Sequence, residues 1–196
     1  AEEFIRPRTS IVVAGTHGKT TTTSLVAYLL SAAGLDPSFL VGGVPTDFAR
    51  SYRLGAGPHF VVEGDEYDCA FFDKRPKFVH YLPDLAIIGN LEYDHADIYP
   101  DLAAVQTAFV RLLNVIPRRG LVVAGVESPA LREILPRAHS RVQTFGLGVE
   151  ADWRADEVAP APDGWSFRLR RQGRDLGIFR SQLHGEHNLR NAVAAL

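Results

Sequence analysis

The chain has 196 residues, of which 46% are hydrophobic and 22% are charged. These proportions are ordinary for a globular protein and exclude a largely disordered chain. The formal net charge is −2 and no long basic run occurs, so nucleic acid is not an expected partner. We expect one domain with a single well-packed core.

The sequence carries no signature of export or of membrane insertion. Cys69 is the only cysteine, so an internal disulfide is impossible. No charged and apolar leader opens the chain, and no apolar stretch approaches the ~20 residues that span a bilayer. We therefore expect a cytoplasmic protein without a membrane partner. Because the chain starts at Ala1, contains no methionine and stops at Leu196 within a helical pattern, we also expect it to be part of a longer protein.

The first elements in chain order are a strand, a glycine turn and a helix. Residues 10–15 form a β-branched run that ends in glycine. Residues 19–33 have apolar positions at helical spacing, among them Val26, Leu29 and Leu30.

Strands and helices then alternate along the chain. This alternation predicts an α/β fold, with a mostly parallel sheet of the P-loop type and helices on both faces. The predicted strands are residues 60–62, 85–88, 121–124 and 142–145, and the predicted helices are residues 102–113 and 130–135.

The pattern changes after Gly148. Polar, alternating segments at residues 165–171 and 176–183 follow a turn at residues 160–164. We expect a small antiparallel β extension at about residues 149–184, and a last helix from His187 onward.

A phosphate-binding loop is predicted where the first strand meets the first helix. Glycines let backbone N–H groups surround phosphate oxygens, and the helix N-terminus adds partial positive charge. Lys19 would reach the terminal phosphates of ATP, and Thr20 would offer its hydroxyl to Mg²⁺. A glycine-rich helix start with a chance lysine is the structural alternative. The loop consists of Gly15, Thr16, His17, Gly18, Lys19, Thr20 and Thr21.

A second candidate is the carboxylate at the end of the predicted strand 60–62. Ligands of a doubly wound sheet bind at the carboxyl ends of its strands, and Mg²⁺ takes oxygen ligands. We therefore predict that Glu63 completes a magnesium site begun by Thr20. Asp65, Glu66 and Asp68 follow closely, but acidic loops are commonly only solvated, so Glu63 alone is predicted as a ligand.

A third cluster follows the predicted strand 85–88. His95 stands beside Asp94 shortly after this strand ends. It is a candidate second metal ligand or phosphate contact. His59, His80, His139 and His184 are expected to be structural, and Cys69 is expected to pack.

Four motifs in this order resemble the Mur ligase family. They are the loop at residues 15–21, the strand-end Glu63, the segment 90–95 and the Gly-x-His-Asn-x-x-Asn segment at 185–191. The resemblance covers essentially the whole chain. It implies the central ATP-binding domain at residues 1–196, with a UDP-sugar-binding domain before it and an amino-acid-binding domain after it in the complete enzyme.

The resemblance also implies an activity. The stretches 42–48 and 71–81 fit the murein-recycling branch of the family better than the alanine-adding branch. Recycling enzymes join UDP-N-acetylmuramate to the tripeptide L-Ala-γ-D-Glu-meso-diaminopimelate. ATP would phosphorylate the lactyl carboxylate, and the tripeptide amine would attack the acyl phosphate. The alternatives are a UDP-N-acetylmuramate–L-alanine ligase and, in another class, a non-catalytic nucleotide-binding regulatory module.

The family's residue roles carry over to matching positions. Lys19 and His95 would be catalytic, because Lys19 neutralises phosphate charge and His95 holds a second Mg²⁺. His187, Asn188 and Asn191 would surround the adenine. The segment 73–75 either contacts the tripeptide or is a solvated turn. We expect the isolated domain to bind ATP weakly and not to ligate. The sequence does not predict an oligomeric state.

Overall fold

The computed structural model describes residues 2–94 and 98–196. The α-helices are α1 (Lys19–Ala32), α2 (Leu102–Val115), α3 (Pro129–Ile134) and α4 (Glu186–Ala195), with 3-10 turns η1 (Lys77–Tyr81) and η2 (Leu135–Arg137). The strands are β1 (Thr9–Ala14), β2 (Ser38–Leu40), β3 (Tyr52–Arg53), β4 (His59–Glu63), β5 (Asp68–Ala70), β6 (Asp73–Pro76), β7 (Leu85–Ile88), β8 (Leu121–Gly125), β9 (Arg141–Leu147), β10 (Trp153–Ala161), β11 (Gly164–Arg171) and β12 (Arg174–Ser181).

Ten of these strands form one sheet, in the order β12-β11-β10-β9-β8-β7-β1-β4-β2-β3. All neighbours from β2 and β4 through β9 run parallel. The predicted α/β fold with a mostly parallel sheet is therefore confirmed. The short strands β2 and β3 were not predicted, since they offer only three and two residues of pattern.

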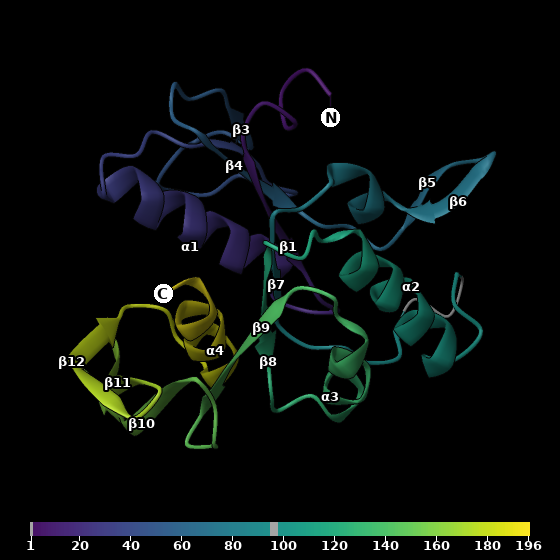
Figure 1. Ribbon diagram of the computed structural model, residues 1–196. Helices are drawn as coiled ribbons and strands as arrows, with labels where there is room; N and C mark the ends of the chain where they lie inside the picture. The colour runs from purple at the N-terminus through teal and green to yellow at the C-terminus, as the bar shows by residue number, and fades with distance from the viewer. Residues whose placement is uncertain (1, 95–97) are drawn as a thin grey trace.

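The helices cover both faces of the parallel strands, as Figure 1 shows, with α1 and α4 on one side and α2 and α3 on the other. Alternate residues of β1 enter different cores, because side chains of a strand point to opposite faces. Ile11 and Val13 pack in the core beneath α1 and α4, whereas Val12 and Ala14 pack beneath α2 and α3. Burial on both faces explains why these strands read as continuous apolar runs.

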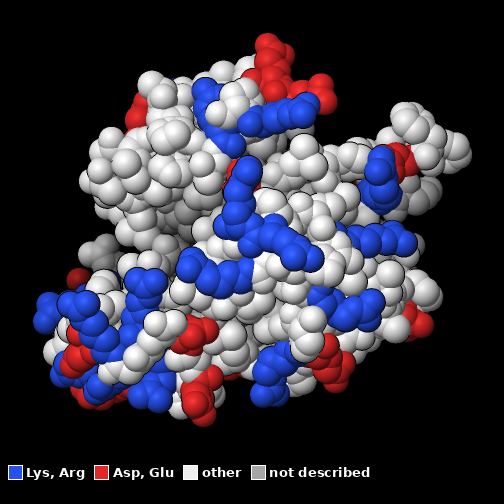
Figure 2. Space-filling model, viewed as in Figure 1, with Lys and Arg blue, Asp and Glu red and all other residues white. Residues whose placement is uncertain are grey.

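The predicted antiparallel extension consists of β10, β11 and β12. It is continuous with the main sheet, because β10 pairs in parallel with β9 through Trp153 and Phe145. Basic and acidic side chains intermingle over this extension (Figure 2), including the ion pairs of Arg168 with Glu157 and Asp175. A register shift between Leu169 and Arg170 interrupts the β11–β12 ladder.

A second, two-stranded antiparallel sheet is formed by β5 and β6. This hairpin projects from the body of the molecule (Figure 1). Phe71 and Phe72 at its tip are 93% and 91% exposed. Neither strand was predicted, because the segment is short and rich in charges. No helix in the described part of the chain is long and apolar enough to cross a membrane.

Candidate functional site

The predicted phosphate loop connects β1 to α1, as its sequence indicated. Gly15 and Gly18 have φ angles of +132° and +81°, a region that residues with a Cβ rarely adopt. Gly18 is the N-cap of α1, so no side chain from this position accepts from the first-turn N–H groups. These N–H groups are therefore available to an anion at the helix N-terminus.

The segment that follows β7 holds the loop from one side. The Asn90 side-chain oxygen accepts from the His17 N–H at 2.9 Å, and the Asn90 carbonyl accepts from the Thr16 N–H at 3.2 Å. A Cβ on Gly15 would lie 3.0 Å from the Asn90 carbonyl oxygen, so a larger residue would disturb this contact. The sequence predicts no role for Asn90 beyond its place in the segment 90–95.

Lys19 begins α1 and its ammonium turns back over the loop. It donates to the Gly15 carbonyl at 2.8 Å and forms an ion pair of 2.8 Å with Glu66 Oε1. The two side chains are only 15% and 4% exposed. The expectation that Glu66 is a solvated loop carboxylate is therefore wrong, because its pairing with Lys19 makes burial of the charge tolerable. Tyr99 supports the same segment, since its hydroxyl donates to the Glu66 carbonyl at 2.6 Å.

Thr20 and Glu63 lie together, as predicted. The Thr20 hydroxyl donates to Glu63 Oε1 at 3.0 Å, and Glu63 Oε2 accepts from the Gly42 N–H at 2.7 Å. The parallel register of β1 and β4 pairs Val13 with Glu63 and so brings the carboxylate to the loop. A hydroxyl and a carboxylate side by side are a donor set that suits Mg²⁺. Their role as metal ligands stays a prediction.

His95, the predicted second metal ligand, lies outside the described residues. Its neighbour Asp94 is described and lines a cavity of about 620 Å³ next to the loop. Lys19 and Glu63 line the same cavity, together with Lys77 and Tyr81. Lys19 and Glu63, the predicted phosphate and magnesium contacts, therefore face the same cavity.

A second cavity of about 480 Å³ lies on the other side of the loop. His17 lines both cavities, so they adjoin at the loop. Two residues predicted at the adenine, His187 and Asn191, line this second cavity. Its other walls were not predicted, since no sequence signal marks them. They include Gly125, Glu127, Ser128, Phe145 and Arg190.

Asn188 of α4 contacts its neighbours along the chain, and its role at the adenine stays a prediction. It does not line the 480 Å³ cavity; its amide donates to the His184 carbonyl at 2.8 Å and accepts from Asn191 at 3.3 Å. Asn191 itself packs directly against Gly18, where a Cβ would overlap its side-chain oxygen. In this structure Asn188 therefore orients Asn191, which in turn lies against the loop.

In the segment 73–75, Asp73 and Arg75 contact each other, and Asp73 also lies 3.1 Å from His80 of η1. The Arg75 guanidinium donates to both oxygens of Asp73, at 2.9 and 2.8 Å. These hydrogen bonds hold the pKa of the Asp73 carboxyl well below its usual range. The Arg75 fork is thus already engaged within the chain. Cys69 on the same hairpin is exposed, so the expectation that it packs is wrong.

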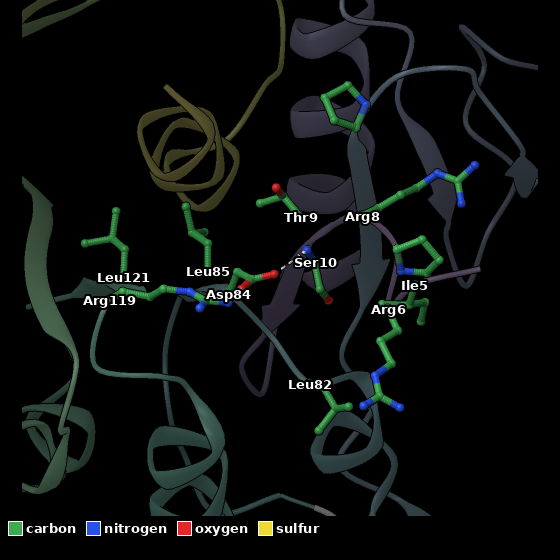
Figure 3. A pocket seen from close by; sticks show the side chains of 13 residues that line it. Ile5, Arg6, Arg8, Thr9, Ser10, Leu82, Asp84, Leu85, Arg119 and Leu121 are labelled. Atoms are coloured by element: carbon green, nitrogen blue, oxygen red, sulfur yellow. Dashed lines mark hydrogen bonds and ion pairs between the residues drawn. The ribbon is translucent and has the colours of Figure 1, made fainter. Parts of the chain in front are cut away.

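A third cavity, of about 660 Å³, lies at the opposite end of the sheet, where β1, β7 and β8 begin. Figure 3 shows Asp84 between Ser10 and Arg119. Asp84 accepts from the Ser10 N–H at 3.1 Å and pairs with Arg119 at 3.7 Å. Because parallel sheets bind ligands at the carboxyl ends of their strands, this cavity is not the nucleotide site.

The Mur ligase middle domain family matches residues 13–196 of the chain. The chain belongs to the Mur ligase family. This confirms the family predicted from the four sequence motifs. The phosphate loop, Glu63 and the final helix of this Mur ligase domain all fall within the matched residues.

Three similar proteins place the domain within the family. A UDP-N-acetylmuramate–L-alanyl-γ-D-glutamyl-meso-2,6-diaminoheptandioate ligase of Haemophilus influenzae is 40% identical over 195 residues, which are 100% of this chain and 42% of that protein. The solved UDP-N-acetylmuramate:L-alanyl-γ-D-glutamyl-meso-diaminopimelate ligase of Neisseria meningitides is 44% identical, with a TM-score of 0.89 over 99% of this chain and 61% of that one. A UDP-N-acetylmuramate–L-alanine ligase of Solibacter usitatus is 39% identical over 195 residues, or 99% of this chain and 40% of that protein. The chain thus spans about two-fifths of the curated relatives.

Proposed function

We propose that the chain is the ATP-binding domain of an ATP-dependent ligase that joins UDP-N-acetylmuramate to L-Ala-γ-D-Glu-meso-diaminopimelate. One observation carries the ATP part of this proposal. The phosphate loop at residues 15–21 brings Lys19 beside the Thr20–Glu63 pair, and residues of this loop line two cavities. A nucleotide in the 480 Å³ cavity and a carboxylate substrate in the 620 Å³ cavity would meet at the loop.

The chain's own residues would serve this reaction mainly by position and charge. ATP would supply the phosphoryl group, and Mg²⁺ held by Thr20 and Glu63 would neutralise phosphate charge. Lys19 would move from Glu66 toward the terminal phosphates. The free N–H groups at the start of α1 would bind phosphate oxygens. His95 keeps its predicted role as the ligand of a second metal ion.

The adenine end of the nucleotide would lie against α4. His187 and Asn191 line the 480 Å³ cavity, and an amide both donates and accepts, as an adenine edge requires. Asn188 would act through Asn191. Phe145 from β9 offers an apolar wall to the same cavity.

The choice of peptide acceptor rests on the relatives. Two of the three proteins compared are tripeptide ligases, and one of these is a solved structure at 44% identity. The alanine ligase at 39% identity supports L-alanine as the alternative acceptor. An acceptor assay on a full-length enzyme containing this chain separates the two. Turnover of L-alanine without turnover of the tripeptide would contradict the proposal.

Calorimetric titration of the chain with ATP tests the nucleotide site directly. We expect weak binding that strengthens when Mg²⁺ is present, and Glu63→Ala should remove the magnesium effect. Glu150→Ala, which changes an exposed carboxylate elsewhere, is the matched control. Equal magnesium dependence in the Glu63 variant and the wild type would exclude Glu63 as a ligand. Formation of an amide by the chain alone would contradict the expectation that the isolated domain does not ligate.

A further inference from the structure

The β5–β6 hairpin and the following turn η1 bring together three side chains that often bind metal ions. Cys69 comes from β5, Asp73 from β6 and His80 from η1. One possible ligand atom of each lies within 4.8 Å of the others. The three residues come from three successive elements, so the cluster depends on how the hairpin folds back onto η1.

The histidine of this cluster has an unusual environment. His80 Nε2 is buried and makes no hydrogen bond with any described residue. It nevertheless lies 3.1 Å from Asp73 Oδ2. The two atoms are at ion-pair distance, and an imidazole nitrogen and a carboxylate oxygen this close together can bind one metal ion between them. The His80 imidazole therefore points at a ligand position.

The distances suit a tetrahedral ion. Zinc bonds of about 2.0 Å to nitrogen or oxygen and 2.3 Å to sulfur separate neighbouring tetrahedral ligand atoms by roughly 3.3–3.6 Å. The Asp73–His80 distance of 3.1 Å is close to this range, and the 4.8 Å limit on the whole cluster requires only small side-chain movements.

We propose that Cys69, Asp73 and His80 bind a zinc ion, with water in the fourth position. A thiolate, an imidazole and a carboxylate together favour Zn²⁺ over Mg²⁺, which prefers oxygen ligands alone. Cys69 is exposed, so its sulfur is accessible to the ion. Its thiol proton passes to solvent as the zinc–sulfur bond forms.

Arg75 does not prevent this binding. It holds the Asp73 carboxylate in the ionised form through two hydrogen bonds. Each carboxylate oxygen has two lone pairs, so Oδ2 retains one for the metal while it accepts from Arg75. The arginine then fixes the orientation of Asp73 from outside the metal shell, as supporting hydrogen bonds do at metal sites.

The metal would bind the hairpin to η1 and so shape the neighbouring cavity. Lys77 and Tyr81, at the two ends of η1, line the 620 Å³ cavity. Fixing η1 through His80 would fix this wall. The zinc site is separate from the predicted magnesium site, because Thr20 and Glu63 are not among its ligands. Its test therefore does not depend on ligase activity.

Cobalt substitution provides the test, because Co²⁺ bound to a thiolate absorbs in the near ultraviolet. We expect the purified chain to bind one Co²⁺ with such a band, and Zn²⁺ to displace it. Cys69→Ser should remove the band, since the chain has no other cysteine. His80→Gln should weaken Co²⁺ binding at least tenfold, whereas His139→Gln, at an exposed histidine outside the cluster, should leave it unchanged.

Circular dichroism of each variant checks that the chain still folds, and size-exclusion chromatography checks that it stays a single species. A band of undiminished strength in His80→Gln would overturn the site. So would one metal ion per two chains, because that ratio indicates a Cys69 bridge between copies. Absence of a thiolate band from the folded wild type would also overturn the proposal.

Discussion

The two ends of the parallel sheet differ in how their polar groups are arranged around the neighbouring cavities. At the carboxyl end, the phosphate loop lies where two cavities adjoin. Lys19 and Glu63 line one of these cavities, and His17 of the loop lines both. At the amino end, the cavity of Figure 3 is larger and holds three arginines. Two of these pair with a neighbour four residues away, since Arg6 contacts Glu2 and Arg8 donates to the Phe4 carbonyl.

The difference teaches that cavity size and charge do not identify a site. Helix N-termini and strand ends at the carboxyl edge present groups that have no partner within their own element. At the amino edge, Arg6 pairs with Glu2, four residues earlier, and Arg119 is 86% exposed beside Asp84. Neither side chain is therefore directed toward shared space with unpartnered groups. Substitutions at the two ends should therefore have very different effects.

The largest effect is expected at Lys19. Lys19→Met removes the charge and leaves Glu66 buried without its ammonium partner, which should cost about 3–5 kcal/mol of stability. ATP affinity should fall by about 30-fold or more, because one charge of a paired contact is lost. Urea unfolding and calorimetry measure the two effects.

The double variant Lys19→Met with Glu66→Gln separates stability from binding. It removes both charges, so most of the stability should return while ATP affinity stays low. Recovery of ATP affinity in the double variant would contradict a direct contact between Lys19 and phosphate. It would also remove the functional difference drawn between the two ends of the sheet.

A smaller effect is expected at Gly18. Gly18→Ala places a Cβ at a φ of +81° and against the Asn191 side-chain oxygen. The backbone strain alone should cost about 1–3 kcal/mol in urea unfolding. Adding Asn191→Ala should relieve the overlap but not the strain, so the double variant should recover only part of the loss. Full recovery would mean that the backbone conformation at Gly18 is not strained for alanine.

Tyr99 should give a pH-dependent effect at the carboxyl end. Burial, followed by the charge of Glu66, raises its pKa from 10.0 to about 12. The folded state therefore keeps the proton longer than the unfolded state, and this part of the stability is present below pH 10 and is lost as pH rises toward 12. Tyr99→Phe should cost about 1 kcal/mol at neutral pH through the lost hydrogen bond.

Chemical unfolding on either side of pH 10 checks the sign. The stability difference between wild type and Tyr99→Phe should shrink as pH rises through the window. A difference that stays constant would mean that Tyr99 ionises alike in the folded and unfolded chains.

The smallest effect is expected at the amino end. Arg119 is 86% exposed and lies 3.7 Å from Asp84, so Arg119→Ala should change stability by less than about 0.5 kcal/mol. ATP affinity should not change. Loss of ATP binding in this variant would mean that the nucleotide binds in the cavity at the amino end of the sheet and not at the phosphate loop.

The parallel sheet and the phosphate loop could be predicted because their signals are local. The run of residues 10–15 and the glycines beside Lys19 define a strand, a turn and a helix within one short segment. Glu63 could be placed near Thr20 because strands of a parallel sheet end at one edge. The side-chain distance of 3.0 Å between them agrees with that inference.

The rest of the site depends on tertiary contacts that carry no local signal. Glu66 reads like its acidic neighbours, and only the fold shows that it is buried against Lys19. Asn188 and Asn191 lie on one helix face and hydrogen-bond each other, as their spacing indicates, but only the fold shows that Asn191 lies against Gly18 and lines the cavity. The β5–β6 hairpin was not predicted because its polar residues pair with each other in the folded chain, as Asp73 and Arg75 do, and such pairs leave no pattern in the sequence.

The interrupted ladder between β11 and β12 bears on how the chain avoids aggregation. β12 ends the strand order of the large sheet, so its outer N–H and C=O groups could template another strand. The register shift opposite Leu169 and Arg170 falls at Leu176 of β12, next to Gly177 with a φ of +101°, so a β-bulge interrupts this edge strand. With Arg174 and Arg180 near its ends, β12 is a poor template for edge-to-edge association between copies of the chain.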